Sequence, residues 1–279
     1  MPNARRGSRQ NGVGALRSIH SFMLSFGELR KKSLAWQLEI SAVEKIYALD
    51  WLLKGIFDRA ALRDALTLRG AAALANAYFE NYPRVADADF ARAAHLDDTV
   101  LERELDAAAA DAARASGLRF KQRNFRSTEA RIEFAGPLGR RSAAQPLIVA
   151  RFVAAPPRVE PTLRPLLHPF GDECQTTVRA IALEELAAER IVLYSQKPRA
   201  RDVFDLWFIL THGADALDLR ATRALAQRLA DAKQVALRSD LDETYAPMLE
   251  RAWDNALKQI QPHPTLAQAR ADIARCLKD

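Results

Sequence analysis

The chain has 279 residues, 49% hydrophobic and 27% charged, which is the composition of a folded protein with one large domain or two modest ones. Charged residues interrupt every apolar run before it reaches the roughly 18 residues of a membrane span, so we expect a cytoplasmic protein. The only cysteines, Cys174 and Cys276, are far apart and have no second Cys or His at metal-ligand spacing, so neither a disulfide framework nor a zinc site is expected.

The formal net charge of +6 is concentrated at the N-terminus. Residues 1–34 contain seven basic residues and one acidic residue, Glu28, and the remaining chain has 34 residues of each sign. Charge runs are usually solvated, so we expect residues 1–34 to be a disordered leader outside the folded unit. Two alternatives stay open, a phosphate-binding arm and a transit peptide.

The first strong helical pattern starts at Leu38, where apolar residues recur at the spacing of a core-facing helix as far as Phe57. A short apolar run at 65–69, the turn residue Gly70 and an Ala-rich run at 71–79 then predict a strand, a tight turn and a helix. Pro83 ends that helix. Residues 85–90 suit a second strand.

Asp97 and Asp98 precede a further helical pattern, which predicts a capped helix ending near Ser116 with Gly117 as its stop. Two antiparallel strands are expected around the turn at 127–129, followed by a third strand. These three strands are predicted at 118–125, 130–134 and 146–154.

Five prolines between residues 156 and 171 indicate a linker or a wrapped loop, which we take as a domain boundary. Beyond it, the sequence predicts only helices, with Pro247, Pro262 and Pro264 between the later ones. The expected helices span 183–194, 203–210, 222–238 and 267–277. The chain is thus divided into a leader (1–34), a lobe containing the sheet (35–170) and a helical lobe (171–279).

Two carboxylates stand out as a candidate metal site. Asp87 and Asp89 are two residues apart on a predicted strand, so both side chains lie on the same face and can share a cation. Mg²⁺ binds one or two protein carboxylates beside a nucleotide's phosphates and keeps several waters. An isolated Asp-x-Asp pair is a weak signal, and the alternative is a solvated strand end.

The turn at Gly70 strengthens this interpretation. A strand, a glycine and a helix start present free backbone N–H groups and the positive end of a helix dipole, which suit a triphosphate. A strand-to-helix turn that needs a permissive residue explains Gly70 equally well on its own.

A second polar cluster lies in the helical lobe. Asp202 and Asp205 share one helix face at the i, i+3 spacing, downstream of the predicted helix that contains Arg190. Without a functional role, Asp202 would be an N-cap and Asp205 a structural ion-pair partner of an arginine. Trp207 and Phe208 are expected to be core residues.

Five segments occur in one order along the chain: Glu44–Phe57, Leu68–Leu74, Asp87–Phe90, Glu184–Arg190 and Arg201–Asp205. In this combination the sequence resembles the AbiEii/AbiGii toxin family of nucleotidyltransferases. The resemblance extends over most of residues 38–210 and is far more specific than any single motif. It implies an α+β fold, with a nucleotidyltransferase-like mixed sheet lobe followed by the helical lobe.

The same resemblance implies a toxin of a type IV toxin–antitoxin system, of the kind associated with abortive infection. Its activity would be Mg²⁺-dependent transfer of a nucleoside monophosphate from an NTP, and its partner an antitoxin; known relatives include enzymes acting on tRNA ends. By position, Asp87 and Asp89 would hold the metal and Asp205 would orient Arg190. The phosphates would be bound by Arg69, Gly70, Ala71, Ala72 and Arg190.

The chain departs from the family pattern at four places. Where the family usually has Lys-Gly-Gly-Thr or Lys-Gly-Gly-Ser, this sequence has Arg69-Gly70-Ala71-Ala72, which lacks one glycine and the phosphate-contacting hydroxyl. Ala86 replaces a usual Glu, and Arg190 replaces a usual Lys. The strand that ends near Arg151 lacks the acidic residue often present there, which leaves Glu133 as the nearby carboxylate candidate.

These features support two competing functions. The first is an enzyme that transfers a nucleoside monophosphate to an RNA 3′-hydroxyl or a protein hydroxyl, mainly by positioning and charge neutralisation. The second is a catalytically impaired relative that binds nucleotide, RNA or an antitoxin-like partner, which the four substitutions favour. Retention of both carboxylates favours the enzyme, because buried polar groups are costly without a purpose. A plain helical scaffold is the third alternative.

Overall fold

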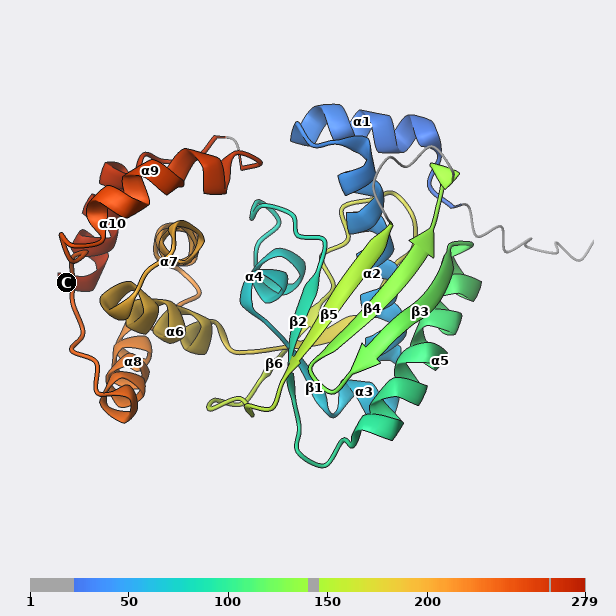
Figure 1. Ribbon diagram of the computed structural model, residues 1–279, viewed down its shortest axis with the longest axis horizontal. Helices are drawn as coiled ribbons and strands as arrows, with labels where there is room; N and C mark the ends of the chain where they lie inside the picture. Colours follow the sequence, from blue (N-terminus) through green and yellow to red (C-terminus); the bar gives the residue numbers. More distant parts are fainter. Residues whose placement is uncertain (1–22, 140–145, 261, 279) are drawn as a thin grey trace, which may run out of the picture.

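The chain builds a single seven-stranded mixed sheet with helices packed on and beside it (Figure 1). The computed structural model describes residues 23–139, 146–260 and 262–278. Most of the expected leader, residues 1–22, therefore lies outside the described residues. The α+β class, with a mixed sheet followed by helices, is confirmed.

The sheet has the strand order β3-β4-β5-β2-β1-β7-β6. Its first half is antiparallel from β3 through β4 to β5, β2 then runs parallel to β5, and β1 lies between β2 and β7. The strands are β1 (Leu66–Arg69), β2 (Ala88–Arg92), β3 (Arg119–Arg126), β4 (Glu129–Ala135), β5 (Leu147–Val153), β6 (Thr162–Pro165) and β7 (Thr177–Ala180).

The helices divide into an N-terminal group against the sheet and a C-terminal group beside it (Figure 1). Among the described residues, no helix is long and apolar enough to cross a membrane. The first group is α1 (Phe26–Trp36), α2 (Ile40–Asp58), α3 (Ala60–Arg63), α4 (Gly70–Ala73), the π-turn η1 (Leu74–Tyr78) and α5 (Asp98–Ser116). The second is α6 (Leu183–Gln196), α7 (Ala200–His212), α8 (Leu219–Lys233), α9 (Ala246–Leu257) and α10 (Leu266–Lys278).

Helix α2 is the central helix of the sheet-containing part and is buried along most of its length. Its Gly55 is needed for close packing, because a Cβ there would lie 2.3 Å from the backbone oxygen of Ala108 in α5. Helix α5 has the predicted termini: Asp97 caps its N-terminus by accepting a hydrogen bond from Val100 N, and Gly117 ends it with φ of 77°.

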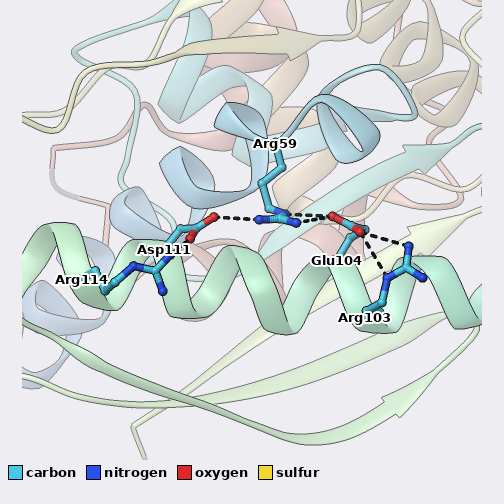
Figure 2. Close-up of polar contacts among 5 residues, drawn as sticks. All are labelled: Arg59, Arg103, Glu104, Asp111 and Arg114. Carbon is cyan, nitrogen blue, oxygen red and sulfur yellow. Dashed lines mark hydrogen bonds and ion pairs between the residues drawn. The ribbon is translucent and has the colours of Figure 1, made fainter.

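An ion-pair cluster ties the end of α2 to α5 (Figure 2). Arg59, between α2 and α3, donates to Glu104 at 2.6 Å and to Asp111 at 2.9 Å. Arg103 and Arg114 contact the same two carboxylates from α5 itself. Hydrogen bonds from Arg59 are the main cause that lowers the pKa of Glu104. One guanidinium thus bridges two turns of α5, which a lysine's single ammonium cannot match.

The helical part begins at Leu183, after β7, and not at residue 171, because β7 pairs with β1 inside the sheet. The proline-rich segment also contains a short strand, β6, contrary to the prediction of no regular structure. Pro165 is tolerated there because β6 is an edge strand. Helix α9 is not among the predicted helices. Pro247, which we expected between helices, lies in the first turn of α9, where proline is favoured.

The N-terminal boundary also differs from the expected one. Ser25 and Glu28 form a capping box that starts α1 at Phe26, inside the expected leader. Leu29 on this helix is fully buried. The folded part therefore begins before residue 35.

Candidate active site

Asp87 and Asp89 lie together at the start of β2, although Asp87 precedes the strand and does not belong to it as predicted. Asp87 Oδ1 accepts a hydrogen bond from Val149 N of β5 at 2.8 Å. The side chains are 36% and 43% exposed, so both carboxylates remain accessible to a ligand. Both residues line a cleft with a volume of about 700 Å³.

Each carboxylate also has a cationic neighbour from the chain itself. Lys45 Nζ on α2 lies 2.9 Å from Asp87 Oδ1, and Arg151 Nη1 on β5 lies 3.6 Å from Asp89 Oδ1. Within the described part of the chain, neither Oδ2 atom accepts a hydrogen bond. The pair is therefore partly neutralised on one side, and its other oxygens are open to a further ligand.

Gly70 occupies the space between Asp89 and Arg190. Its φ of +59° is in the left-handed region that favours glycine, and a Cβ there would lie 3.7 Å from Asp89 Oδ2 and 3.9 Å from Arg190 Nη2. The first turn of α4 thus starts between a carboxylate and a guanidinium. This is the arrangement expected of a turn that receives phosphates near a metal-binding carboxylate.

Arg190 is held by carboxylates of α7. Its Nε donates to Asp205 Oδ2 at 3.1 Å and lies 4.0 Å from Asp202 Oδ1. Burial lowers the pKa of Arg190, but Asp205 and Asp202 outweigh it and hold the pKa above its usual value. The predicted contact between Asp205 and Arg190 is present. Tyr82 adds a hydrogen bond of 2.6 Å to Asp205, so the carboxylate that orients Arg190 is itself fixed.

The other predicted phosphate-binding residues, Arg69, Ala71 and Ala72, do not all line the same cleft. Ala71 and Ala72 line the 700 Å³ cleft with the aspartate pair. Arg69 instead donates to Glu189 at 2.7 Å and lines a separate pocket of about 330 Å³. The Arg69 guanidinium is therefore already paired.

The opposite wall of the cleft comes from the helical part. Phe208, expected in the core, is buried, whereas Trp207 is partly exposed. His212 stacks on Phe208 with ring centroids 4.1 Å apart. The helical residues that line the cleft include Arg201, Phe204, Trp207, Phe208 and His212.

The donor set fits a Mg²⁺ ion only when the nucleotide completes it. Among the described residues, no group of three or more His, Cys, Asp or Glu side chains could hold a metal ion alone. Mg²⁺ needs only one or two carboxylates when phosphates and waters supply its other ligands. The open Oδ2 atoms of Asp87 and Asp89 meet that requirement.

From the sequence we expected Glu133 to be the carboxylate near Arg151, and this prediction is wrong. It pairs with Arg123 and is in register with Leu147. Glu129 is the residue in register with Arg151, with Arg151 Nε 3.9 Å from Glu129 Oε2. The register of β4 against β5, which the sequence does not specify, decides between the two.

Two further residues of the site, Lys45 and Tyr82, are not among those predicted from the sequence. Lys45 is a charged residue in a helix buried on almost every side, and a charge in such a helix needs a partner. That signal was available in the sequence. Tyr82 lies in a loop beside Pro83, and nothing local indicates that its hydroxyl reaches Asp205.

Comparisons with known proteins identify the family and a similar fold. The sequence model of the family described as nucleotidyl transferase AbiEii toxin, type IV TA system, matches residues 51–275. The fold is similar to that of MenT4, a nucleotidyltransferase toxin from Mycobacterium tuberculosis H37Rv, with a TM-score of 0.63 and 18% sequence identity over 91% of this chain and 88% of that chain. A search of curated proteins finds no match. The family match extends over most of the chain, and the chain therefore belongs to the AbiEii nucleotidyl transferase toxin family.

Proposed function

We propose that this protein transfers a nucleoside monophosphate from an NTP to a hydroxyl group of an acceptor. The observation that carries the proposal is the position of Gly70, whose left-handed backbone lies between the Asp89 carboxylate and the Arg190 guanidinium. A phosphate chain seated there meets backbone N–H groups, a cation and a metal-binding carboxylate together.

The chain's own residues would act mainly by positioning. Arg190, fixed by Asp205, would neutralise charge on the phosphates, and Gly70 lets the backbone approach them closely. The acceptor oxygen would form a bond to the α-phosphorus, the bond to pyrophosphate would break, and the hydroxyl proton would be released. Asp87 and Asp89 would hold Mg²⁺, which supplies charge neutralisation when bound.

The acceptor and the partner are parts of the same proposal. The acceptor hydroxyl belongs to an RNA end, such as that of a tRNA, or to a protein. Membership of a type IV toxin family supports an antitoxin as the protein partner. A soluble, cytoplasmic toxin would encounter RNA, protein acceptors and an antitoxin in the same compartment.

A second candidate is a catalytically impaired binding protein. It is supported by the two cations on the carboxylates, because Lys45 and Arg151 provide positive charge where a metal would otherwise bind. It is also supported by Ala72 in place of a hydroxyl residue. This protein would bind nucleotide or a partner without transfer.

Calorimetric titration with each NTP, in Mg²⁺ and in EDTA, tests the metal site. We expect tighter binding in Mg²⁺, and Asp87→Ala or Asp89→Ala should erase the difference because two carboxylate ligands are then reduced to one. Asp215→Ala, at an exposed position outside the cleft, is the matched control. Equal NTP binding by all variants in both buffers would refute the metal site.

A further inference from the structure

The antiparallel half of the sheet has one buried face and one open face. Ile132, Phe134 and Phe152 are almost completely buried on the inner face. The residues that alternate with them point outward and are exposed or partly exposed. In Figure 1 these three strands lie in front of α2 and α5, and no described helix covers their near side. We call this surface the open face of β3–β5.

The open face is strongly basic. The three strands contain six basic and two acidic residues: Arg119, Lys121, Arg123, Arg126, Arg131 and Arg151, with Glu129 and Glu133. The two glutamates already pair with Arg131 and Arg123. Within the described part of the chain, Arg119, Lys121 and Arg126 have no ion pair, and all three are exposed.

The register connects this surface to the aspartate pair. Asp89 is in register with Arg151, Arg151 with Glu129, and Glu129 with Arg126. Register partners lie side by side on one face, and neighbouring strands are about 4.8 Å apart, so Arg126 is about 14 Å from Asp89 along the sheet. Lys121 and Arg119 continue the basic surface on β3, beyond the level of Asp87. The open face therefore begins at the candidate active site.

This concentration of charge is hidden in the sequence. Residues 35–279 are neutral in total, yet residues 119–153 contain eight basic and two acidic residues. Their excess of six is cancelled by an equal acidic excess in the other residues of 35–279. A local basic field on an otherwise neutral folded part attracts a polyanion to one surface.

We propose that the open face of β3–β5 is the docking surface for the acceptor, and that the acceptor is RNA. The proposal rests on the proposed transferase function, since it extends the same site to its second substrate. A row of unpaired arginine and lysine side chains matches the phosphates of a nucleic-acid chain, whose hydroxyl end would then reach the cleft at Asp89. A protein acceptor gives no comparable reason for the excess of positive charge on this surface.

The chemistry of the surface also predicts how RNA is recognised. The aromatic residues of these strands, including Phe120 and Phe125, are in register with residues of the inner face, so none is placed to stack on a base. Binding should therefore depend on phosphate contacts, fall steeply with salt, and show little preference for base sequence.

Fluorescence anisotropy with a labelled single-stranded RNA oligonucleotide tests the docking surface. The variant Arg119→Gln/Lys121→Gln/Arg126→Gln should bind RNA about tenfold or more weakly, and the slope of log affinity against log salt should become shallower by about 2, for three lost phosphate contacts. The matched control is Arg220→Gln/Arg228→Gln/Lys233→Gln on α8, which removes the same charge from exposed residues. The control should bind like the wild type.

Equal RNA affinity in the wild type and the open-face variant would overturn the assignment, as would equal weakening in both triple variants. Thermal unfolding and NTP titration of the same proteins test whether the fold and the nucleotide site are intact, and we expect wild-type values in both triple variants. If the wild type labels RNA and the open-face variant labels it equally well, the docking surface is wrong while the transferase stands. If no variant transfers nucleotide but RNA binding depends on the open face, the transferase proposal fails alone.

Discussion

Ala71 and Ala72 stand where the family pattern described above has a second glycine and a hydroxyl residue. Gly70 keeps the left-handed backbone that begins α4, so the turn itself is preserved. Ala71 and Ala72 line the cleft but supply neither a second glycine nor a hydroxyl. The expected consequence is a weaker phosphate site with an intact backbone framework, because one charge-assisted hydrogen bond is worth about 1.5–3 kcal/mol.

Restoring these groups should raise activity. We predict that Ala71→Gly with Ala72→Ser increases nucleotide transfer about tenfold to a hundredfold if the contact strengthens in the transition state. Serine is chosen because Ala72 is only 2% exposed and tolerates few added atoms. Initial rates with labelled NTP measure the effect, and adding Asp89→Ala should cancel the gain. An unchanged rate in a variant that still binds NTP would contradict this explanation. The weak activity would then be attributed to the missing acidic residue on the strand near Arg151.

At the scale of elements, one buried polar cluster fastens the proline-rich segment to α2. His168 lies between two carboxylates, with Nδ1 2.9 Å from Asp50 and Nε2 2.6 Å from Asp172. Tyr47 and Trp51 of α2 also donate to Asp172. Burial by itself lowers the pKa of His168, but the hydrogen bonds to Asp172 and Asp50 outweigh it and raise the pKa to about 11.

This cluster should make stability depend on pH. The pKa of His168 is higher in the folded chain than its ordinary 6.5, so its contribution is complete below about pH 6.5 and is lost as pH rises towards 11. We predict that His168→Gln lowers the free energy of unfolding by about 3–5 kcal/mol at pH 6, because a buried carboxylate is left unpaired. Urea unfolding should show that the difference in free energy of unfolding between wild type and His168→Gln becomes smaller as the pH rises from 6 towards 11. A difference independent of pH would contradict a charged His168, and the exposed Glu173→Gln is the control.

Elements with strong local signals were predictable, and those defined by long-range pairing were not. The caps Asp97 and Gly117 fixed α5, and apolar periodicity fixed α2. In contrast, β6 and β7 form because they pair with each other and with β1, more than 100 residues upstream of β7 in the chain. The predicted strand at 85–90 starts too early for the same reason, since its start depends on long-range pairing. The alternation of residues extends N-terminal to Asp89, the first residue of β2 that pairs with β1, and Asp87 therefore lies just before the strand.

For the whole molecule, two deletions at the N-terminus should differ in their effect on stability. Deleting residues 1–22 should leave the unfolding transition unchanged, because α1 and its capping box remain. Deleting residues 1–33 removes the buried Leu24 and Leu29 and should lower the free energy of unfolding by about 3 kcal/mol or more. Calorimetry of the two truncated proteins measures both. A large loss of stability in the shorter deletion would contradict this division.

The candidate site could be predicted only in part at this scale. The family-like order of the motifs predicts one site from Gly70, the aspartate pair, Arg190 and Asp205. In the structure Gly70 lies beside Asp89 and Arg190, and Arg190 contacts Asp205. The partners Lys45 and Arg151 depend on how α2 and β5 meet β2, which no local pattern encodes. The basic open face was missed because charge was summed over residues 35–279, where opposite excesses cancel.

The central claim is that this chain transfers nucleotides, and one incubation tests it most directly. Purified protein is mixed with each α-labelled NTP, Mg²⁺ and total RNA, with an antitoxin-free cell extract as the source of protein acceptors. The account predicts label on RNA from at least one NTP, release of an equal amount of pyrophosphate, and loss of both with Asp89→Ala. NTP binding without label on any RNA or protein would contradict it and identify the chain as a binding protein.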